Sequence, residues 1–164
     1  MKLSLGTVQF GLTYGIANQS GQVSLEQACE VVALARANGI ADLDTAIAYG
    51  DAEARLGQIG VQGFRVVTKL PPLPDALSIE VTDAGMWAKA HLAASLQRLG
   101  VSSVYGLLLH RPADLLSHHG KALLKALQDL RAEGLVQKLG VSIYAPDELE
   151  SLMPLGRWDL VQAP

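Results

Sequence analysis

Short apolar runs alternate with longer amphipathic segments along the chain. The apolar runs predict six strands, which are Leu3–Val8, Ile40–Asp44, Arg65–Leu70, Val104–His110, Val136–Ser142 and Trp158–Val161. Apolar residues at helical spacing predict the helices between them, from Ser24 to Gly39, Asp51–Ile59, from about Asp83 to Leu99, Lys121–Glu133 and from Pro146 onward. Strands and helices that alternate in units of about 20 to 40 residues predict parallel strands covered by helices.

The first long helix has a start and a stop signal in the sequence. Ser24 with Gln27 three positions later is a capping box, and Gly39 is a typical residue just past a helix end. Cys29 lies in the apolar pattern of this helix, which favours a packing role for it.

Composition narrows the classes of protein that fit. The 164 residues are 49% hydrophobic and 18% charged, which predicts one folded domain with a substantial core. A net charge of -3 gives no reason to expect nucleic acid or a membrane surface as a partner. The single cysteine excludes an internal disulfide and a cysteine metal cage, so we expect a reducing, cytoplasmic location. No apolar run reaches the ~18 residues of a membrane span.

Polar side chains stand where five of the predicted strands finish. They are Asp44, Lys69, His110, Ser142 and Gln162. In a parallel barrel or an open α/β sheet the carboxyl ends of the strands share one face, and active sites are built there. The joint placement therefore predicts a functional site at that face.

Each of these side chains also has a purely structural interpretation. Asp44 could cap a turn, Lys69 could extend to water, and His110 could be a hydrogen-bonded core histidine. Tyr49, which follows the second strand, could be an ordinary surface aromatic. Their combination favours chemistry over these alternatives.

The chemistry that fits this set is proton donation by a phenol. An unperturbed phenol has a pKa of about 10, so Tyr49 needs charged neighbours to act near neutral pH. A Lys69 ammonium nearby would lower that pKa, and Asp44 would hold Lys69 charged. His110 could bind a substrate carbonyl while Tyr49 protonates its oxygen. The hydride for such a reduction must come from a cofactor, because no side chain supplies one.

At these residues the sequence resembles the aldo-keto reductase family. The matching segments keep the family's order and are LGTVQFG at 5–11, LDTAIAYGDAE at 43–53, TKL at 68–70, SLQRLG at 95–100, LLLHRP at 107–112 and LGVS at 139–142. The resemblance implies a (β/α)8 barrel of the TIM type and a nicotinamide cofactor, NADPH or NADH. It also implies an oxidoreductase that reduces a small aldehyde or ketone.

Site residues follow from the resemblance position by position. Those matching the catalytic tetrad are Asp44, Tyr49, Lys69 and His110, with Tyr49 as the proton donor, and those matching contacts to the nicotinamide carboxamide are Ser142 and Gln162. Two positions depart from the pattern. Ile143 stands where many members have asparagine, and Tyr105 stands where an acidic residue is common.

Length sets a further expectation. A (β/α)8 barrel has eight strands and typically about 250 residues, and the loops after strands seven and eight usually hold a phosphate in such barrels. We therefore expect residues 1–164 to be the N-terminal part of a single barrel domain, without the main phosphate site of the cofactor. The unpaired outer strands of such a sheet would allow self-association.

Other functions remain open from the residues alone. The same fold could serve as a non-catalytic, nucleotide-sensing or regulatory module, or Lys69 could form a Schiff base with a carbonyl substrate. His118 and His119 have no acidic neighbour at ligand spacing, so we expect them to be solvated and predict no metal site.

Overall fold

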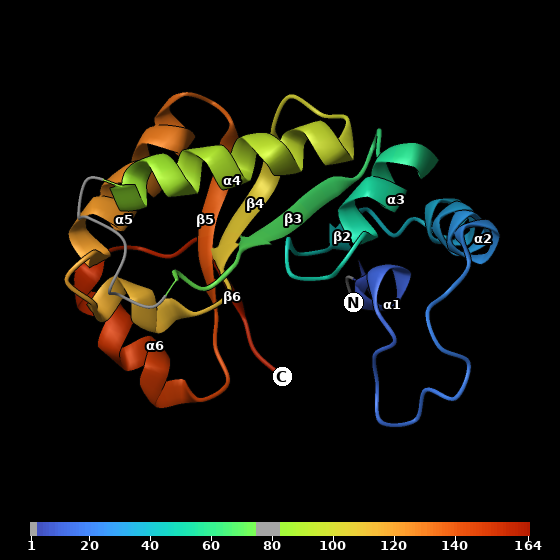
Figure 1. The fold of residues 1–164 in the computed structure, drawn as a ribbon, viewed down its shortest axis with the longest axis horizontal. Helices are drawn as coiled ribbons and strands as arrows, with labels where there is room; N and C mark the ends of the chain where they lie inside the picture. The colour runs from blue at the N-terminus through green and yellow to red at the C-terminus, as the bar shows by residue number, and fades with distance from the viewer. Residues whose placement is uncertain (1–2, 75–82) are drawn as a thin grey trace.

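The computed structural model of the chain describes residues 3–74 and 83–164, in which strands and helices alternate (Figure 1). The strands are β1 (Ser4–Gly6), β2 (Asp42–Asp44), β3 (Arg65–Leu70), β4 (Val104–Leu109), β5 (Val136–Ser142) and β6 (Leu160–Gln162). The helices are α1 (Val8–Gly11), α2 (Leu25–Ala37), α3 (Ala52–Ile59), α4 (Asp83–Leu99), α5 (Gly120–Ala132) and α6 (Pro146–Leu152), with short 3-10 helices η1 (Pro112–Leu116) and η2 (Met153–Leu155).

The six strands form one sheet in chain order, from β1 to β6, and every neighbouring pair is parallel. Each link between neighbours is therefore a βα crossover of the kind that builds a (β/α)8 barrel. Figure 1 shows the sheet curling, with α4 running along its outer side. The arrangement confirms the predicted incomplete barrel of six parallel strands.

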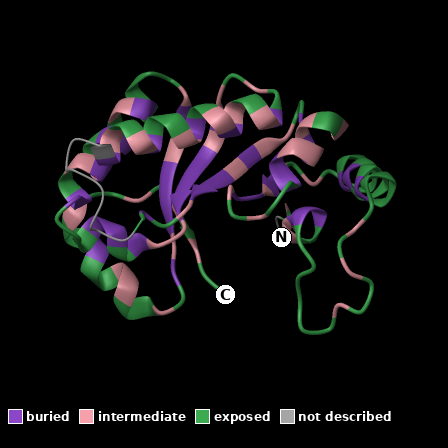
Figure 2. Ribbon diagram, viewed as in Figure 1, coloured by how far each residue is buried: buried purple, intermediate pink, exposed green. Residues whose placement is uncertain are grey.

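The core lies between the sheet and the helices, and Figure 2 shows buried residues concentrated on the strands. Successive side chains of a strand point to opposite faces. In β4 the inner face carries Gly106, where a Cβ would lie 2.6 Å from a methyl group of Leu160 on β6. Leu107 and Leu109 alternate with it on the outer face and are each 1% exposed. Burying a leucine of this kind contributes about 1.5–3 kcal/mol.

Helix α2 begins as the sequence predicts. Ser24 accepts a hydrogen bond from the Gln27 amide, and the Gln27 side chain accepts one from the Ser24 amide, which completes the capping box. The predicted packing role of Cys29 is wrong, because its side chain is exposed. Ala28 and Val32 make the buried stripe of the helix instead.

Several boundaries differ from the sequence prediction. The first strand covers only Ser4–Gly6, because the chain turns into α1 at Val8. The last strand begins at Leu160 rather than at Trp158. The connection after β4 contains η1, and His119 after it is 2% exposed rather than solvated, while His118 is exposed as predicted.

Candidate active site

Tyr49 lies on the turn that joins β2 to α3. Its amide donates to the carbonyl of Ala46 at 3.0 Å, and its own carbonyl accepts from the amide of Ala52 at 3.1 Å. Gly50 follows with φ +56°, a left-handed conformation that glycine adopts without strain. These features fix the backbone that carries the phenol.

Gly11, the last residue of α1, lets this turn pack closely. A Cβ on Gly11 would lie 1.7 Å from the Tyr49 carbonyl oxygen, and one on Gly50 would lie 2.4 Å from the Gly11 carbonyl oxygen. Any side chain at either position would displace the Tyr49 turn. The LGTVQFG and AYGD segments therefore fit together through backbone contact.

Lys69 is the fifth residue of β3, and its side chain is 1% exposed. The ammonium donates a 2.7 Å hydrogen bond to Asp44 at the end of β2 and a 2.9 Å hydrogen bond to the carbonyl of Thr45. A buried ammonium is tolerated only when it is paired and hydrogen-bonded. Asp44 and the Thr45 carbonyl meet that requirement.

The aromatic groups complete a compact cluster. The Lys69 ammonium lies 5.0 Å from the centre of the Tyr49 ring, and the rings of Tyr49 and His110 meet edge to face with centres 5.9 Å apart. His110 follows β4 directly, and its amide donates to the carbonyl of Leu70. The structure thus brings Asp44, Tyr49, Lys69 and His110 together at the carboxyl ends of β2, β3 and β4.

The protonation chemistry of the phenol differs from the sequence expectation. Burial, together with the negative charge of Asp44, raises the pKa of Tyr49 to about 12. We expected Lys69 to lower it. The difference arises because the Lys69 ammonium is directed at Asp44 and the Thr45 carbonyl, and contacts the face of the Tyr49 ring. Tyr49 is therefore a protonated phenol at neutral pH.

Burial also acts on the two nitrogen bases. It lowers the pKa of Lys69, although the Asp44 charge opposes this change. Burial and the nearby Lys69 charge lower the pKa of His110, so its imidazole is neutral at pH 7. The Nδ1 atom of His110 is buried and has no hydrogen-bond partner within residues 3–74 and 83–164.

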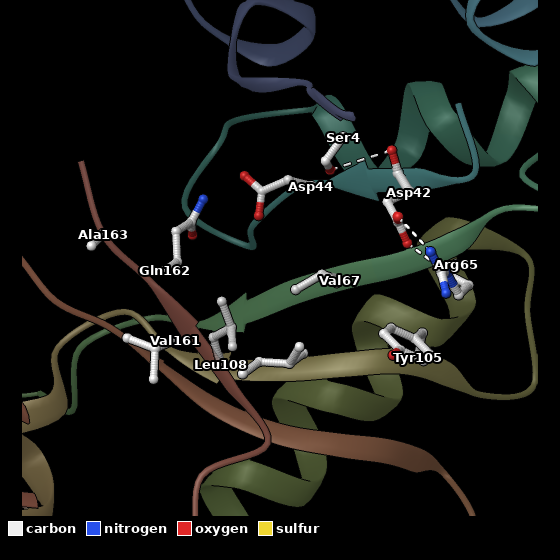
Figure 3. A pocket seen from close by; sticks show the side chains of 11 residues that line it. Ser4, Asp42, Asp44, Arg65, Val67, Tyr105, Leu108, Val161, Gln162 and Ala163 are labelled. Atoms are coloured by element: carbon white, nitrogen blue, oxygen red, sulfur yellow. Dashed lines mark hydrogen bonds and ion pairs between the residues drawn. The ribbon is translucent and has the colours of Figure 1, made fainter. Parts of the chain in front are cut away.

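Ser142 and Gln162 lie beside each other at the ends of β5 and β6, where they are register partners. The Gln162 backbone carbonyl accepts from the amide of Ile143 at 2.8 Å. The side-chain Oε1 of Gln162 is buried and lacks a partner among the residues that the structure describes. Figure 3 shows Gln162 and Asp44 facing the same space from opposite sides.

That space is a cavity of about 500 Å³ on the inner face of the sheet. Its residues come from β1 to β4 and from β6, and Figure 3 shows them: Ser4, Asp42, Asp44, Arg65, Val67, Tyr105, Leu108, Leu160, Val161, Gln162 and Ala163. Away from Asp44, the Arg65 guanidinium makes two 2.6 Å hydrogen bonds to Asp42 and lies 5.1 Å from the centre of the Tyr105 ring. Tyr105, which departs from the family pattern, thus forms part of the cavity wall.

Sequence reasoning missed a clamp on the segment that follows β3. Asp114 accepts from the amide of Leu73 at 2.9 Å, while Arg111 donates to the Leu73 carbonyl at 2.5 Å and to Asp114 at 2.7 Å. Arg111 directly follows His110 in the sequence. Together with Asp114 it holds the backbone of Leu73, in the segment after Lys69. The i, i+3 spacing of Arg111 and Asp114 behind a strand end was the available signal.

No group of three or more metal-ligating side chains occurs in residues 3–74 and 83–164. No helix in the same ranges has the length and apolar character to cross a membrane.

The model of the Aldo/keto reductase family matches residues 2–164, almost the whole chain. The chain belongs to the aldo-keto reductase family. A comparison with curated protein sequences finds no match. Members of this family are generally NAD(P)H-dependent oxidoreductases that act on small carbonyl substrates.

Solved aldo-keto reductase structures support the same fold. A Pseudomonas aeruginosa protein named for this family is 28% identical, with a TM-score of 0.77, over 98% of this chain and 61% of its own. The holo form of a Bacillus halodurans aldo-keto reductase has a TM-score of 0.75 at 18% identity, over 99% of this chain and 52% of its own. A Bombyx mori aldo-keto reductase in complex with NADP has a TM-score of 0.70 at 24% identity, over 98% of this chain and 53% of its own. The chain thus spans between about half and three fifths of these structures.

Proposed function

We propose that this chain carries the catalytic residues of an NAD(P)H-dependent reductase that converts an aldehyde or ketone into an alcohol. The observation that carries the proposal is the Lys69 ammonium, 1% exposed and held by Asp44 against the Tyr49 ring. A buried charge beside a phenol is costly to maintain, and it is well placed to stabilise a phenolate.

Tyr49 is the proton donor in this proposal. Its raised pKa keeps the phenol protonated at neutral pH, ready to donate to the oxygen of a reacting carbonyl. The phenolate left after transfer would lie beside the Lys69 ammonium, whose charge Asp44 supports. In this proposal the Lys69 charge offsets part of the cost that burial and the Asp44 charge place on that phenolate, so the phenol is a stronger acid with Lys69 than without it.

His110 orients the substrate. Its neutral imidazole stands edge to face with the Tyr49 ring, so one ring nitrogen can hydrogen-bond the carbonyl oxygen that Tyr49 protonates. A neutral imidazole donates a hydrogen bond through one nitrogen only. The reacting oxygen would then have two donors, the Tyr49 hydroxyl and His110.

The cofactor would supply a hydride to the carbonyl carbon when bound. Ser142 and Gln162 are the residues of this chain that would hold its carboxamide. The buried Oε1 of Gln162, which has no partner within residues 3–74 and 83–164, fits this role, because an acceptor there can take a hydrogen bond from an amide NH2 group. NADPH and NADH share that amide, so these residues suit either cofactor.

The rest of the cofactor would need a larger barrel. In (β/α)8 enzymes a phosphate site is frequently formed by the loops after strands seven and eight. Within residues 3–74 and 83–164 the sheet has six strands. We therefore propose that residues 1–164 act as the N-terminal part of one barrel domain, and that these residues alone bind the cofactor weakly.

The test is turnover by a complete barrel. Residues 1–164 would be joined to the C-terminal two fifths of the Pseudomonas aeruginosa relative, and NADPH and NADH oxidation would be measured with a panel of aldehydes and ketones. The proposal predicts carbonyl-dependent oxidation of at least one cofactor. Tight nucleotide binding without turnover of any carbonyl would instead support a nucleotide-sensing module.

A further inference from the structure

A second buried charge cluster lies beside the proposed tetrad, on the helix side of the sheet. Glu53 on α3 has a side chain that is only 2% exposed. Its carboxylate accepts from Thr68 at 2.6 Å, from Ser95 at 2.9 Å, and from Arg98 at 2.6 and 2.8 Å. One carboxylate thereby joins α3, β3 and α4.

The completeness of this cluster makes it rigid. An unpaired buried carboxylate costs several kcal/mol, so Glu53 is stable only where its hydrogen-bond donors are all in place. The Nε and Nη2 atoms of Arg98 both donate to Oε2 of the carboxylate, and such charge-assisted hydrogen bonds are stronger than neutral ones. Thr68 and Ser95 occupy the remaining acceptor positions from two further directions.

Close packing of α3 on α4 brings the partners within reach. Gly57 lies one helical turn after Glu53, and a Cβ there would be 2.0 Å from the Arg98 carbonyl oxygen. The two helices therefore touch through their backbones at this point. A larger residue at position 57 would separate Glu53 from Ser95 and Arg98.

Glu53 is linked to both central groups of the tetrad by short, ordered stretches of chain. On one side, the Ala52 amide at the start of α3 donates to the Tyr49 carbonyl. On the other side, Thr68 directly precedes Lys69 in β3. Because side chains alternate along a strand, Thr68 projects to the helices while Lys69 projects to the inner face.

We propose that Glu53 is a positioning residue that holds the Tyr49 turn in register with Lys69 through its hydrogen bond to Thr68. The inference rests on the proposed reduction, since it assigns the cluster a task in that reaction. It adds a side-chain link between α3 and β3 to the direct contacts of the turn, in which the Ile47 amide donates to the Lys69 carbonyl and the Lys69 ammonium donates to the Thr45 carbonyl. Loss of the Thr68–Glu53 hydrogen bond would leave Lys69 buried. It would also free α3 and the Tyr49 turn to move relative to Lys69.

The test compares two hydroxyl deletions on the same carboxylate. Thr68→Val removes the link to β3 and keeps the shape and strand preference of the side chain. Ser95→Ala removes the link to α4 and is the matched control, because Glu53 keeps Thr68 and Arg98. Thr68→Ser, which retains the hydroxyl, is the conservative rescue.

Two measurements separate positioning from general stability. Hydrogen exchange of the 45–52 segment, followed by mass spectrometry in the 164-residue chain, should become about tenfold faster in Thr68→Val than in Ser95→Ala. In the complete barrel, Thr68→Val should lower kcat about tenfold with KM within about twofold, while Thr68→Ser stays near the parent. Thermal melting of all three variants reports global stability.

The exchange result stands without turnover, so it judges the positioning role even if the barrel proves inactive. Equal exchange of the 45–52 segment in Thr68→Val and Ser95→Ala would overturn the inference. An unchanged kcat in Thr68→Val would overturn it as well. An inactive parent barrel with fast exchange in Thr68→Val alone would refute the proposed function and leave the mechanical link in place.

Discussion

Lys69 and Asp44 form a 2.7 Å ion pair that joins the ends of two neighbouring strands. The Lys69 side chain is 1% exposed and that of Asp44 is 18% exposed. The ammonium therefore needs the carboxylate as a partner, whereas the carboxylate can also be solvated by water. The pair is thus both a structural and a chemical element of the site.

Removing the carboxylate should therefore be costly. Asp44→Asn leaves a buried ammonium without its charge partner, and breaking a buried pair in this way costs about 3–5 kcal/mol. The partial exposure of Asp44 favours the lower end of that range. Denaturant unfolding measures the loss, with Asp159→Asn as a control that breaks the ion pairs to Arg131 and Lys138. A loss below about 1 kcal/mol for Asp44→Asn would show that Lys69 is not charged in the folded chain.

Stability should rise with pH as the histidines lose their protons. Burial lowers the pKa of His110 from 6.5, and it also lowers that of His91. Below about pH 6.5 the unfolded chain therefore binds more protons than the folded chain, so stability is lost as the pH falls through that window. The free energy of unfolding should be higher at about pH 7.5 than at about pH 5.5.

Replacement of one histidine tests this assignment. His110→Asn should reduce the difference in the free energy of unfolding between the two pH values, because an amide does not titrate there. An undiminished pH dependence in both His110→Asn and His91→Asn would contradict the direction of the two pKa shifts.

The contact between α3 and α4 gives a prediction for stability. Gly57→Ala places a Cβ 2.0 Å from the Arg98 carbonyl oxygen, and overpacking of this kind typically costs about 1–3 kcal/mol. Gly6→Ala is the matched control, since a Cβ there meets nothing within 4 Å and its φ is not positive. Thermal or denaturant unfolding should separate the two variants, and equal stabilities would mean that the helices can move apart freely.

The 164-residue chain itself should bind NADPH weakly and associate through its outer strands. The sheet leaves β1 and β6 each with one neighbour, and exposed strand edges promote pairing between chains. Nucleotide fluorescence and light scattering, recorded in one titration, report both properties. Micromolar NADPH binding by a monomer would place the main cofactor contacts within these residues.

Placement of the tetrad could be predicted from the sequence because it depends on strand ends. Asp44, Lys69 and His110 each finish a short apolar run, and parallel strands bring such ends to one face. The same logic put Ser142 and Gln162 at that face, where the structure shows them to be register partners. Apolar periodicity and strand order carry this information without knowledge of side-chain packing.

Burial of individual polar groups could not be predicted in the same way. Glu53 reads in the sequence as an acid in the first turn of a helix, but its partners Thr68 and Ser95 are 15 and 42 positions away. The raised pKa of Tyr49 and the burial of His119 likewise depend on segments packed from elsewhere in the chain. A one-dimensional pattern does not contain those distances.

The role of Tyr49 is tested most directly by comparing carbonyl reduction in the complete barrel with and without its hydroxyl. Tyr49→Phe keeps the ring that contacts Lys69 and His110 and removes only the proton donor. General acid catalysis contributes about 10²–10⁴ in rate, so kcat should fall by at least about a hundredfold while the Kd for NADPH stays within about threefold. Reduction by Tyr49→Phe at close to the parent rate would contradict the account, because another group would then supply the proton.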